Sequence, residues 1–438
     1  MTKWDPLHER YFYYLGSLSF DKAKELLDKD GHRMNDDFLP HFHMLIQLER
    51  SYHNFGFVVG PKGNLSNIRK DKSLCQCYSD LHMSLIEEQA NNKSNIPSQT
   101  SVDEAKELSY IQKLTAGLIT FLSVRTSLMK LYEQISTAVK RSEHNVRLEN
   151  YLDETLTISQ LDMSSLNIPV LQSLRRLLKH EIDCLLLLIQ SYVFICEYQY
   201  MDGISTLHHM HCVLKEWNDN IENQQNTNHR FTLSSTSPLS FFKTTTKPAL
   251  YTFYFKFHEL LVAKFTLYFT DILLEYGGPD AKTPISKTNS EISARIAHFY
   301  RRSNVEWITL ILNTKKEPSS SNQLKTDNTT TSENDNSYQI IFGYPSKLNA
   351  TDDIAQQILK KVAINIETLV SGEKIFYHGD ANQLKTYFLQ NIDPRITLAF
   401  VFASHRQERD TTITTFLNEL LGILRGIRQL IYFKNAAK

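Results

Sequence analysis

The sequence predicts an α+β protein, in which a large all-helical region is followed by a small α/β domain. Glycine (14) and proline (12) are scarce in 438 residues, and apolar residues recur with helical periodicity through most of residues 1–276. After about residue 288 the pattern changes to short runs rich in β-branched residues, which are typical of strands. We therefore expect a helical bundle over residues 1–288 and an α/β domain over residues 289–438.

Several helices of the first region are delimited by recognisable caps. Asp5-Pro6 suits the start of a helix, and Ser101-Val102-Asp103-Glu104 forms a capping box. The apolar stripe that follows predicts a helix of roughly 40 residues. Two further long helices are expected over Ile168–Tyr198 and Leu250–Tyr276, the latter ending at Gly277-Gly278. Long helices of similar length favour an antiparallel bundle.

Polar segments interrupt this pattern. Glu222–Lys247 and Lys315–Ser337 are dominated by Ser, Thr, Asn and other polar residues, so little of them can be buried. We expect both to be disordered or loop-like. The second is predicted to be an insert within the α/β domain.

The α/β region reads as a helix, two strands, a helix, three strands and a final helix. In order these are Glu291–Arg301, Val305–Leu312, Tyr338–Phe342, Asp352–Leu369, Lys374–Tyr377, Leu384–Gln390, Arg395–Ala403 and a helix capped by Asp410. Both faces of Arg395–Ala403 are apolar, which predicts a central strand. An antiparallel sheet with this order of elements resembles the roadblock and longin class of domains, which commonly serve as dimerisation platforms on regulators of small GTPases.

Charge and apolar patterning exclude several classes of protein. The chain has 48 Lys and Arg against 48 Asp and Glu, so no net field attracts it to nucleic acid or to an anionic membrane. The longest apolar stretch, Cys184–Cys196, falls short of the about 20 residues that cross a bilayer, and the N-terminus has no secretory pattern. We expect a soluble, intracellular protein whose Cys184 and Cys196 are core thiols without disulfides.

No sequence motif predicts catalysis. Neither a phosphate-binding G-x-x-x-x-G-K-[ST] loop nor a dinucleotide-binding G-x-G-x-x-G pattern is present. Gly16-Ser17-Leu18-Ser19 contains a glycine and serines but lies in a helical region, so we interpret it as a helix break rather than a nucleophile elbow. The prediction is a non-enzymatic protein with no catalytic residue, cofactor site or metal site.

The strongest chemical alternative is His208-His209-Met210-His211-Cys212. On a helix, His208, His211 and Cys212 share one face, and imidazole and thiolate groups at that spacing could ligate zinc in a metal-dependent hydrolase. The other interpretation is an amphipathic helix with solvent-facing or hydrogen-bonded histidines, since no second ligand pair accompanies it. Cys75-x-Cys77 and His41-x-His43 depart from the usual spacings of metal ligands.

Three segments carry a resemblance to a known family. They are Tyr14-Leu15-Gly16-Ser17-Leu18-Ser19-Phe20-Asp21-Lys22-Ala23-Lys24, Leu260-Leu261-Val262-Ala263-Lys264-Phe265-Thr266-Leu267-Tyr268-Phe269 and Phe402-Ala403-Ser404-His405-Arg406-Gln407-Glu408-Arg409-Asp410. In type, order and position they resemble the KICSTOR complex subunit 2 family, and the resemblance covers nearly the whole chain. No catalytic residues are assigned in that family to carry over.

The resemblance implies a scaffold role in nutrient signalling. Members of the family belong to the KICSTOR assembly with kaptin, an FG-GAP repeat protein and a very large scaffold subunit. That assembly holds the GATOR GTPase-activating complex at the lysosome and restrains mTOR signalling when amino acids or glucose are scarce. A cytoplasmic chain that reaches the lysosomal membrane through partners is therefore expected. A vesicle-trafficking adaptor of longin type is the alternative.

Overall fold

The computed structural model describes residues 5–34, 38–57, 73–94, 102–141, 147–229, 247–315, 337–370, 375–380 and 384–431. Two compact units are formed. The first consists of Met1–Gln190, Thr206–His258 and Arg428–Lys438, and the second consists of Ser191–Ser205 and Glu259–Ile427. Whether residues 1–288 and 289–438 are separate domains stays a prediction.

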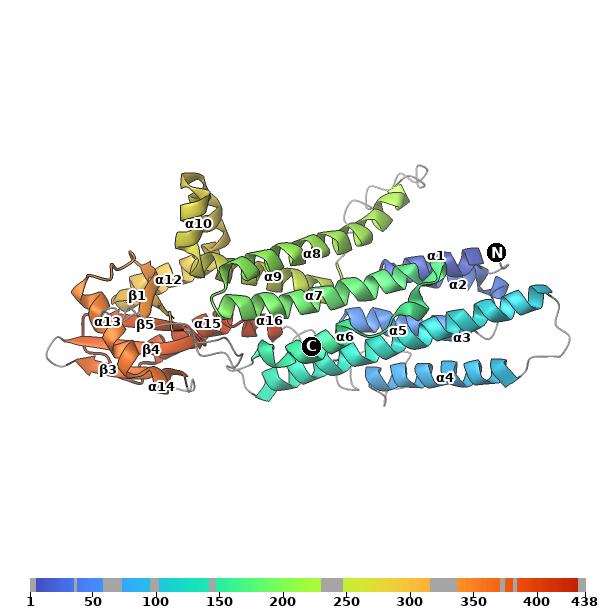
Figure 1. Cartoon of the computed structure of the whole chain (residues 1–438), viewed down its shortest axis with the longest axis horizontal. Coiled ribbons are helices and arrows are strands. Elements are labelled where there is room, and N and C mark those ends of the chain that lie inside the picture. Colours follow the sequence, from blue (N-terminus) through green and yellow to red (C-terminus); the bar gives the residue numbers. More distant parts are fainter. Residues whose placement is uncertain are drawn as a thin grey trace, which may run out of the picture. The chain divides into compact units, whose positions relative to one another are not determined.

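The first unit is built from helices (Figure 1). They are α1 (Asp5–Gly16), α2 (Phe20–Asp30), α3 (Leu39–His53), α4 (Leu74–Ser94), α5 (Val102–Arg141) and α6 (Leu152–Ser159), with short 3-10 turns η1 (Gly31–Arg33), η2 (Leu148–Tyr151), η3 (Ser164–Leu166) and η4 (Pro169–Leu171). Helices α7 (Gln172–Cys196), α8 (Tyr200–His229) and α9 (Ala249–Tyr268) contribute residues to both units. The 40 residues of α5 confirm the predicted long helix, which packs along α4.

The predicted break after α1 is confirmed, and it depends on two special residues. Leu18 has a left-handed φ of 58°, and the Ser19 N–H donates to the Tyr14 carbonyl at 2.8 Å, which closes the end of the helix. A Cβ atom added to Gly16 would lie 2.6 Å from the backbone of Ser173. Only glycine allows the two backbones to approach this closely.

Two helix boundaries differ from the predictions. Helix α8 continues to His229, so the first residues of the predicted loop Glu222–Lys247 are helical, and residues 230–246 lie outside the described residues. The segment predicted as one helix over Leu250–Tyr276 is divided at Phe269, after which α10 (Thr270–Gly277) ends at Gly278 with a positive φ, as predicted for a C-cap. The capping-box residue Ser101 and residues 316–336 of the predicted insert also lie outside the described residues.

The second unit contains a five-stranded antiparallel sheet in the order β2-β1-β5-β4-β3. Its elements after α10 are η6 (Pro279–Ala281), α11 (Lys282–Thr288), α12 (Ser290–Ser303), β1 (Val305–Asn313), β2 (Tyr338–Tyr344), α13 (Asp353–Ile364), α14 (Ile366–Val370), β3 (Phe376–Asp380), β4 (Lys385–Asp393), β5 (Ile396–Phe402), α15 (Thr411–Leu424) and α16 (Ile427–Leu430). The α+β class and the order of strands and helices are confirmed. One difference is a break within the predicted helix Asp352–Leu369, where the Asn365 amide donates to the Lys361 carbonyl between α13 and α14.

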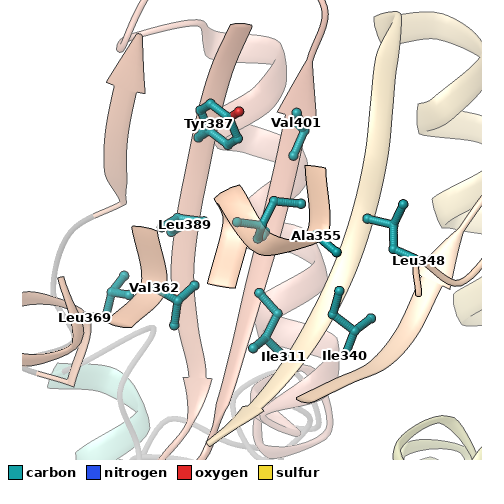
Figure 2. Close-up of a cluster of buried hydrophobic side chains, with 11 residues drawn as sticks. Ile311, Ile340, Leu348, Ala355, Val362, Leu369, Tyr387, Leu389 and Val401 are labelled. Atoms are coloured by element: carbon teal, nitrogen blue, oxygen red, sulfur yellow. The ribbon is translucent and has the colours of Figure 1, made fainter. Parts of the chain in front are cut away.

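Apolar side chains cover both faces of this sheet, as predicted for β5. On one face Ala399 and Val401 belong to a buried cluster with α13 residues that includes Val362 (Figure 2). On the other face Phe400 contacts Phe299 of α12 at 5.7 Å between ring centroids, because successive side chains of a strand point to opposite faces. The central place of β5 between β1 and β4 follows from this two-sided burial.

The last helix begins at the predicted cap. The Asp410 carboxylate accepts hydrogen bonds from the backbone N–H groups of Thr412 (3.0 Å) and Ile413 (3.3 Å). Near the other end of α15, the buried Arg425 guanidinium donates to the carbonyls of Ile392 (2.9 Å) and Asn391 (2.8 Å). Asp410 thus caps the first turn of α15, and Arg425 attaches the other end of the helix to β4.

A pair of glycine substitutions tests the role of close backbone approach. Gly16→Ala is expected to lower the free energy of unfolding by about 1–3 kcal/mol, because the new methyl group overlaps the backbone of Ser173. Gly422→Ala, in the interior of α15 with no atom within 4 Å of the added Cβ, is expected to raise it by about 0.5–1 kcal/mol. Urea unfolding followed by circular dichroism measures both free energies. Equal effects of the two substitutions would contradict a close backbone approach at Gly16.

Candidate functional site

The most concentrated group of ionisable side chains lies inside the first unit, around Arg125 of α5. Its guanidinium donates through Nε to Glu49 Oε1 at 3.0 Å and through a terminal nitrogen to Glu49 Oε2 at 2.9 Å. The other terminal nitrogen is paired with Glu181 of α7. All three side chains have no exposed surface. Arg125 also lies over the ring of Tyr52, 4.2 Å from its centroid.

Four buried tyrosines complete this cluster, which we call the Arg125 network. Tyr78 donates to Glu49 at 2.7 Å, Tyr52 and Tyr132 both donate to Glu181, and Tyr132 is also bonded to Tyr254 of α9. Burial, followed by the nearby carboxylates, raises the pKa of each of these tyrosines well above its ordinary value. The phenols therefore stay protonated and act as hydrogen-bond donors.

Charge neutralisation explains how Glu49 remains ionised without water. Burial alone raises the pKa of this carboxyl, but the charge of Arg125 and contacts with His53 and Arg125 lower it to about 2. The Arg125 guanidinium loses water on burial, yet the two carboxylates raise its pKa well above the ordinary value. The network joins α3, α4, α5, α7 and α9. Because its members are buried, their hydrogen bonds and ion pairs join neighbouring helices to one another.

A second buried ion pair lies in the second unit, where Lys264 of α9 meets Asp393 at the end of β4. Lys264 Nζ is 2.9 Å from Asp393 Oδ1, and the Tyr268 hydroxyl donates to Asp393 Oδ2. Cys196 donates its thiol to Asp393 Oδ1 at 3.2 Å and accepts from Lys264 Nζ at 3.3 Å. A bulge between Asn391 and Asp393 interrupts the pairing of β4 with β5 immediately before this carboxylate.

This Lys264 network also shifts the pKa values of its members. Burial, then the charge of Asp393, raises the pKa of the Cys196 thiol, which makes the thiolate inaccessible at neutral pH. Burial opposes the charged form of Lys264, but Asp393 outweighs it and raises the pKa of the ammonium group. The side chains of Lys264 and Asp393 are each 1 % exposed. Cys196 is buried as predicted, and its thiol takes part in this ion-paired cluster.

The sequence analysis did not identify either network. The available signal is a single charged residue inside an apolar helical stripe: Arg125 follows Leu118 and Leu122, and Lys264 lies within the family-like segment from Leu260 to Phe269. Such residues are almost never fully buried unless they are paired. Their partners are far away in the sequence, so the signal reveals that a partner exists without revealing which residue it is.

The third family-like segment forms a tightly bonded turn between β5 and α15. Arg406 donates from its side chain to the Ser303 carbonyl at 2.7 Å, and its backbone carbonyl accepts from the Tyr377 hydroxyl at 2.7 Å. The Thr386 hydroxyl donates to the Ser404 carbonyl at 2.9 Å. Together with the Asp410 cap, these contacts give the segment a structural role in positioning α15.

The alternative zinc ligands His208, His211 and Cys212 do not form a three-residue set. His208 and Cys212 are exposed on α8 with Nε2 and Sγ 3.8 Å apart, whereas the His211 ring packs against His258 at 5.8 Å between centroids. A search of the described residues for three His, Cys, Asp or Glu side chains that could hold a metal ion finds no such group.

The residues of the other two pairs with unusual spacing have contacts or burial of their own. Cys77 is buried while Cys75 is half-buried, and burial raises the pKa of the Cys75 thiol. His41 Nε2 is 2.9 Å from the Ser84 hydroxyl of α4. This contact joins α3 to α4.

One helix in the described part of the chain is long and apolar enough to cross a membrane, by length and composition alone. It spans Ala105–Val139 within α5 and has a mean hydropathy of 1.2 over its most apolar window. However, 61 % of that window is buried inside the protein, and the ion-paired Arg125 lies in the same helix. A core helix of a bundle has these properties.

Comparison with known proteins identifies the family. A family model described as "KICSTOR complex C12orf66 like" matches residues 2–438. The chain belongs to this family. KICSTOR subunit 2 of Xenopus laevis is 24 % identical over 448 aligned residues, which cover 98 % of this chain and 96 % of the relative. KICSTOR subunit 2 of Danio rerio is 24 % identical over 456 residues, which cover 98 % and 95 %. The predicted family is therefore confirmed.

Removal of the central guanidinium tests the Arg125 network. Arg125→Met is expected to lower the free energy of unfolding by about 3–5 kcal/mol, because two buried carboxylates lose their counter-ion. Arg50→Met removes an exposed ion pair with Asp21 and is expected to cost at most about 1 kcal/mol. Urea unfolding of both variants measures the difference. Equal costs would contradict a central role for Arg125.

The pKa of Glu49 predicts an acid-dependent loss of stability. Its folded value of about 2 lies below the ordinary 4.5, so the stabilisation is complete above pH 4.5 and is lost as the pH falls toward 2. This shift corresponds to roughly 3 kcal/mol. In Glu49→Gln the fall in unfolding free energy across this pH range should be smaller by about that amount. Glu259→Gln, at an exposed carboxyl group, is the control. An equal reduction of the pH dependence in this variant would contradict the role of Glu49.

Proposed function

We propose that this chain is a non-catalytic adaptor subunit of a KICSTOR-type assembly and acts through surface contacts with other proteins. The observation that carries the proposal is the match of residues 2–438 to one family, with relatives named KICSTOR subunit 2 aligned over nearly their whole length. Burial of the Arg125 and Lys264 networks supports it, because these ionisable groups hold helices and strands rather than face a substrate. No cofactor or metal is needed for such a role.

The wider role that follows is in nutrient signalling. The partners are expected to be kaptin, the FG-GAP repeat subunit and the large scaffold subunit, and the assembly would recruit the GATOR GTPase-activating complex to the lysosome. In this role the chain negatively regulates mTOR signalling on amino-acid or glucose starvation. It binds no nucleic acid, and its attachment to the lysosomal membrane is peripheral and indirect.

Co-purification tests membership of the assembly. The tagged chain, isolated under mild conditions from its own cells, is expected to bring down kaptin, the FG-GAP repeat subunit and the large scaffold subunit in stoichiometric amounts. Arg125→Met, which disturbs the fold, should reduce their recovery, whereas Arg50→Met should not. If the wild-type chain recovers none of these partners, the assignment fails.

A vesicle-trafficking adaptor is the second candidate, and the five-stranded antiparallel sheet with helices on both faces is the observation that favours it. Localisation separates the two functions. The nutrient-signalling proposal predicts that the chain resides at lysosomes in starved cells. Residence on transport vesicles under both fed and starved conditions supports the trafficking adaptor instead.

A metal-dependent hydrolase is the third candidate, because His208 Nε2 and Cys212 Sγ lie 3.8 Å apart on α8. Metal content tests it. Elemental analysis of the purified chain is expected to find less than about 0.1 zinc or iron per molecule, because a true site binds tightly enough to survive purification. A stoichiometric metal that is lost in a His208→Ala variant would overturn the non-catalytic proposal.

A further inference from the structure

Helix α10 is unusual because it is apolar but contains no fully buried residue. Its eight residues include Ile272, Leu273, Leu274 and Tyr276, and the Tyr276 side chain is 79 % exposed. The helix leaves the direction of α9 after the break at Phe269 (Figure 1). Large apolar side chains that remain accessible and adjacent to one another often mark an interaction surface.

The apolar surface continues onto the first turn of α8. The ring of Tyr200 is stacked with that of Tyr276, with 6.4 Å between the ring centroids. It is also stacked with the ring of Phe265, with 5.5 Å between the centroids. Next to Tyr200, Met201 is 71 % exposed, and one helical turn later Ile204 is 38 % exposed. We call Tyr200, Met201, Ile204 and Tyr276 the α10 patch.

Aromatic packing holds this patch in place. Tyr200 also contacts the buried Phe269 at 5.4 Å, and a Cβ atom added to Gly203 would lie 3.1 Å from Phe265. Helix α8 therefore lies close against α9 at this point. A rigid base of this kind lets a partner bind exposed side chains without first ordering them.

The segments that form the patch carry charge of one sign. Residues 191–205 and 270–280 contain Glu197, Asp202, Asp271, Glu275 and Asp280, and these segments contain no Lys, Arg or His. Asp271 is paired with Lys347, and Arg395 donates to the Glu197 backbone carbonyl at 2.8 Å. The side chains of Glu197, Glu275 and Asp280 are exposed. This acidic border attracts a basic protein segment and repels an anionic membrane surface.

We propose that the α10 patch binds an amphipathic helix of a partner protein, with an apolar stripe bordered by lysine and arginine. Tyr200 and Ile204 of the patch are spaced by four residues on α8, and Tyr276 follows Ile272 at the same spacing on α10. Rows of this spacing are the ridges that pack into the grooves of another helix. Tyrosine is among the residues that most often anchor such contacts. The proposal rests on the proposed adaptor function, for which it supplies one partner-binding surface.

Two synthetic peptides provide the test. One is an 18-residue amphipathic helix of leucine and lysine, and the other has the same pattern with glutamate in place of lysine. Fluorescence anisotropy with the purified full-length chain is expected to show binding of the lysine peptide only. A double variant, Met201→Ser with Tyr276→Ser, should weaken that binding by at least about tenfold. Glu275→Lys should weaken it as well, and added salt should do the same.

Matched controls keep the outcome specific. Met83→Ser with Leu161→Ser alters exposed apolar residues of the first unit, 53 % and 37 % exposed, and should bind the lysine peptide like the wild type. All variants should keep the circular dichroism spectrum of the wild type, and their urea midpoints should shift only slightly, because the substituted side chains are largely exposed. Equal binding of both peptides, or unchanged binding by the double variant, overturns the proposal.

Other occupants would be revealed by separate measurements. Concentration-dependent dimerisation in sedimentation that is lost with Tyr276→Ser would assign the patch to a second copy of this chain. Binding to phosphatidylserine vesicles that is lost with the same substitution would assign it to a membrane. Both results overturn the proposal. Failure of peptide binding leaves the co-purification test of the adaptor function intact, so the two proposals can fail independently.

Discussion

Arg125 imposes the strictest constraint on the first unit, because its charge is placed where no water reaches it. Transfer of a guanidinium into the interior is favourable only when carboxylates and further hydrogen bonds replace the lost water. Glu49 and Glu181 meet that need from different helices, and the hydroxyls of Tyr52, Tyr78 and Tyr132 donate further hydrogen bonds to the two carboxylates. The helices must therefore adopt one relative arrangement, since any slip leaves a charge unpaired. We infer that the network specifies the packing of this bundle more than it adds to its stability.

The second unit meets a similar constraint with different groups. Lys264 and Tyr268 of α9 both reach Asp393, which follows a bulge at the end of β4. A regular strand alternates its side chains strictly between two faces, and a bulge is the local change that can redirect one of them. Arg425 binds the carbonyls of Asn391 and Ile392 at the same strand end. Helix α9, the sheet and α15 are thus joined at one point.

Local patterns in the sequence predicted most of the fold, and long-range contacts account for what they missed. The apolar periodicity predicted the length of α5, and the apolar residues on both faces of β5 predicted its central place in the sheet. Asp410 predicted the start of α15. The turn at Leu18 was harder to specify, because a left-handed conformation at a residue other than glycine has no clear sequence signal. Neither network was predicted, since each joins residues that are far apart along the chain.

The interior and the surface of this protein carry different kinds of chemistry. Glu49, Glu181, Lys264 and Cys196 are groups that can act as bases or nucleophiles, yet each is at most 5 % exposed. Burial and ion pairing also move the pKa values of Lys264 and Cys196 upward, away from the reactive neutral amine and thiolate forms. At the surface, by contrast, α10 presents apolar side chains with an acidic border. Buried ionisable groups that fix the packing, beneath a surface with exposed apolar side chains, agree with the proposed adaptor function.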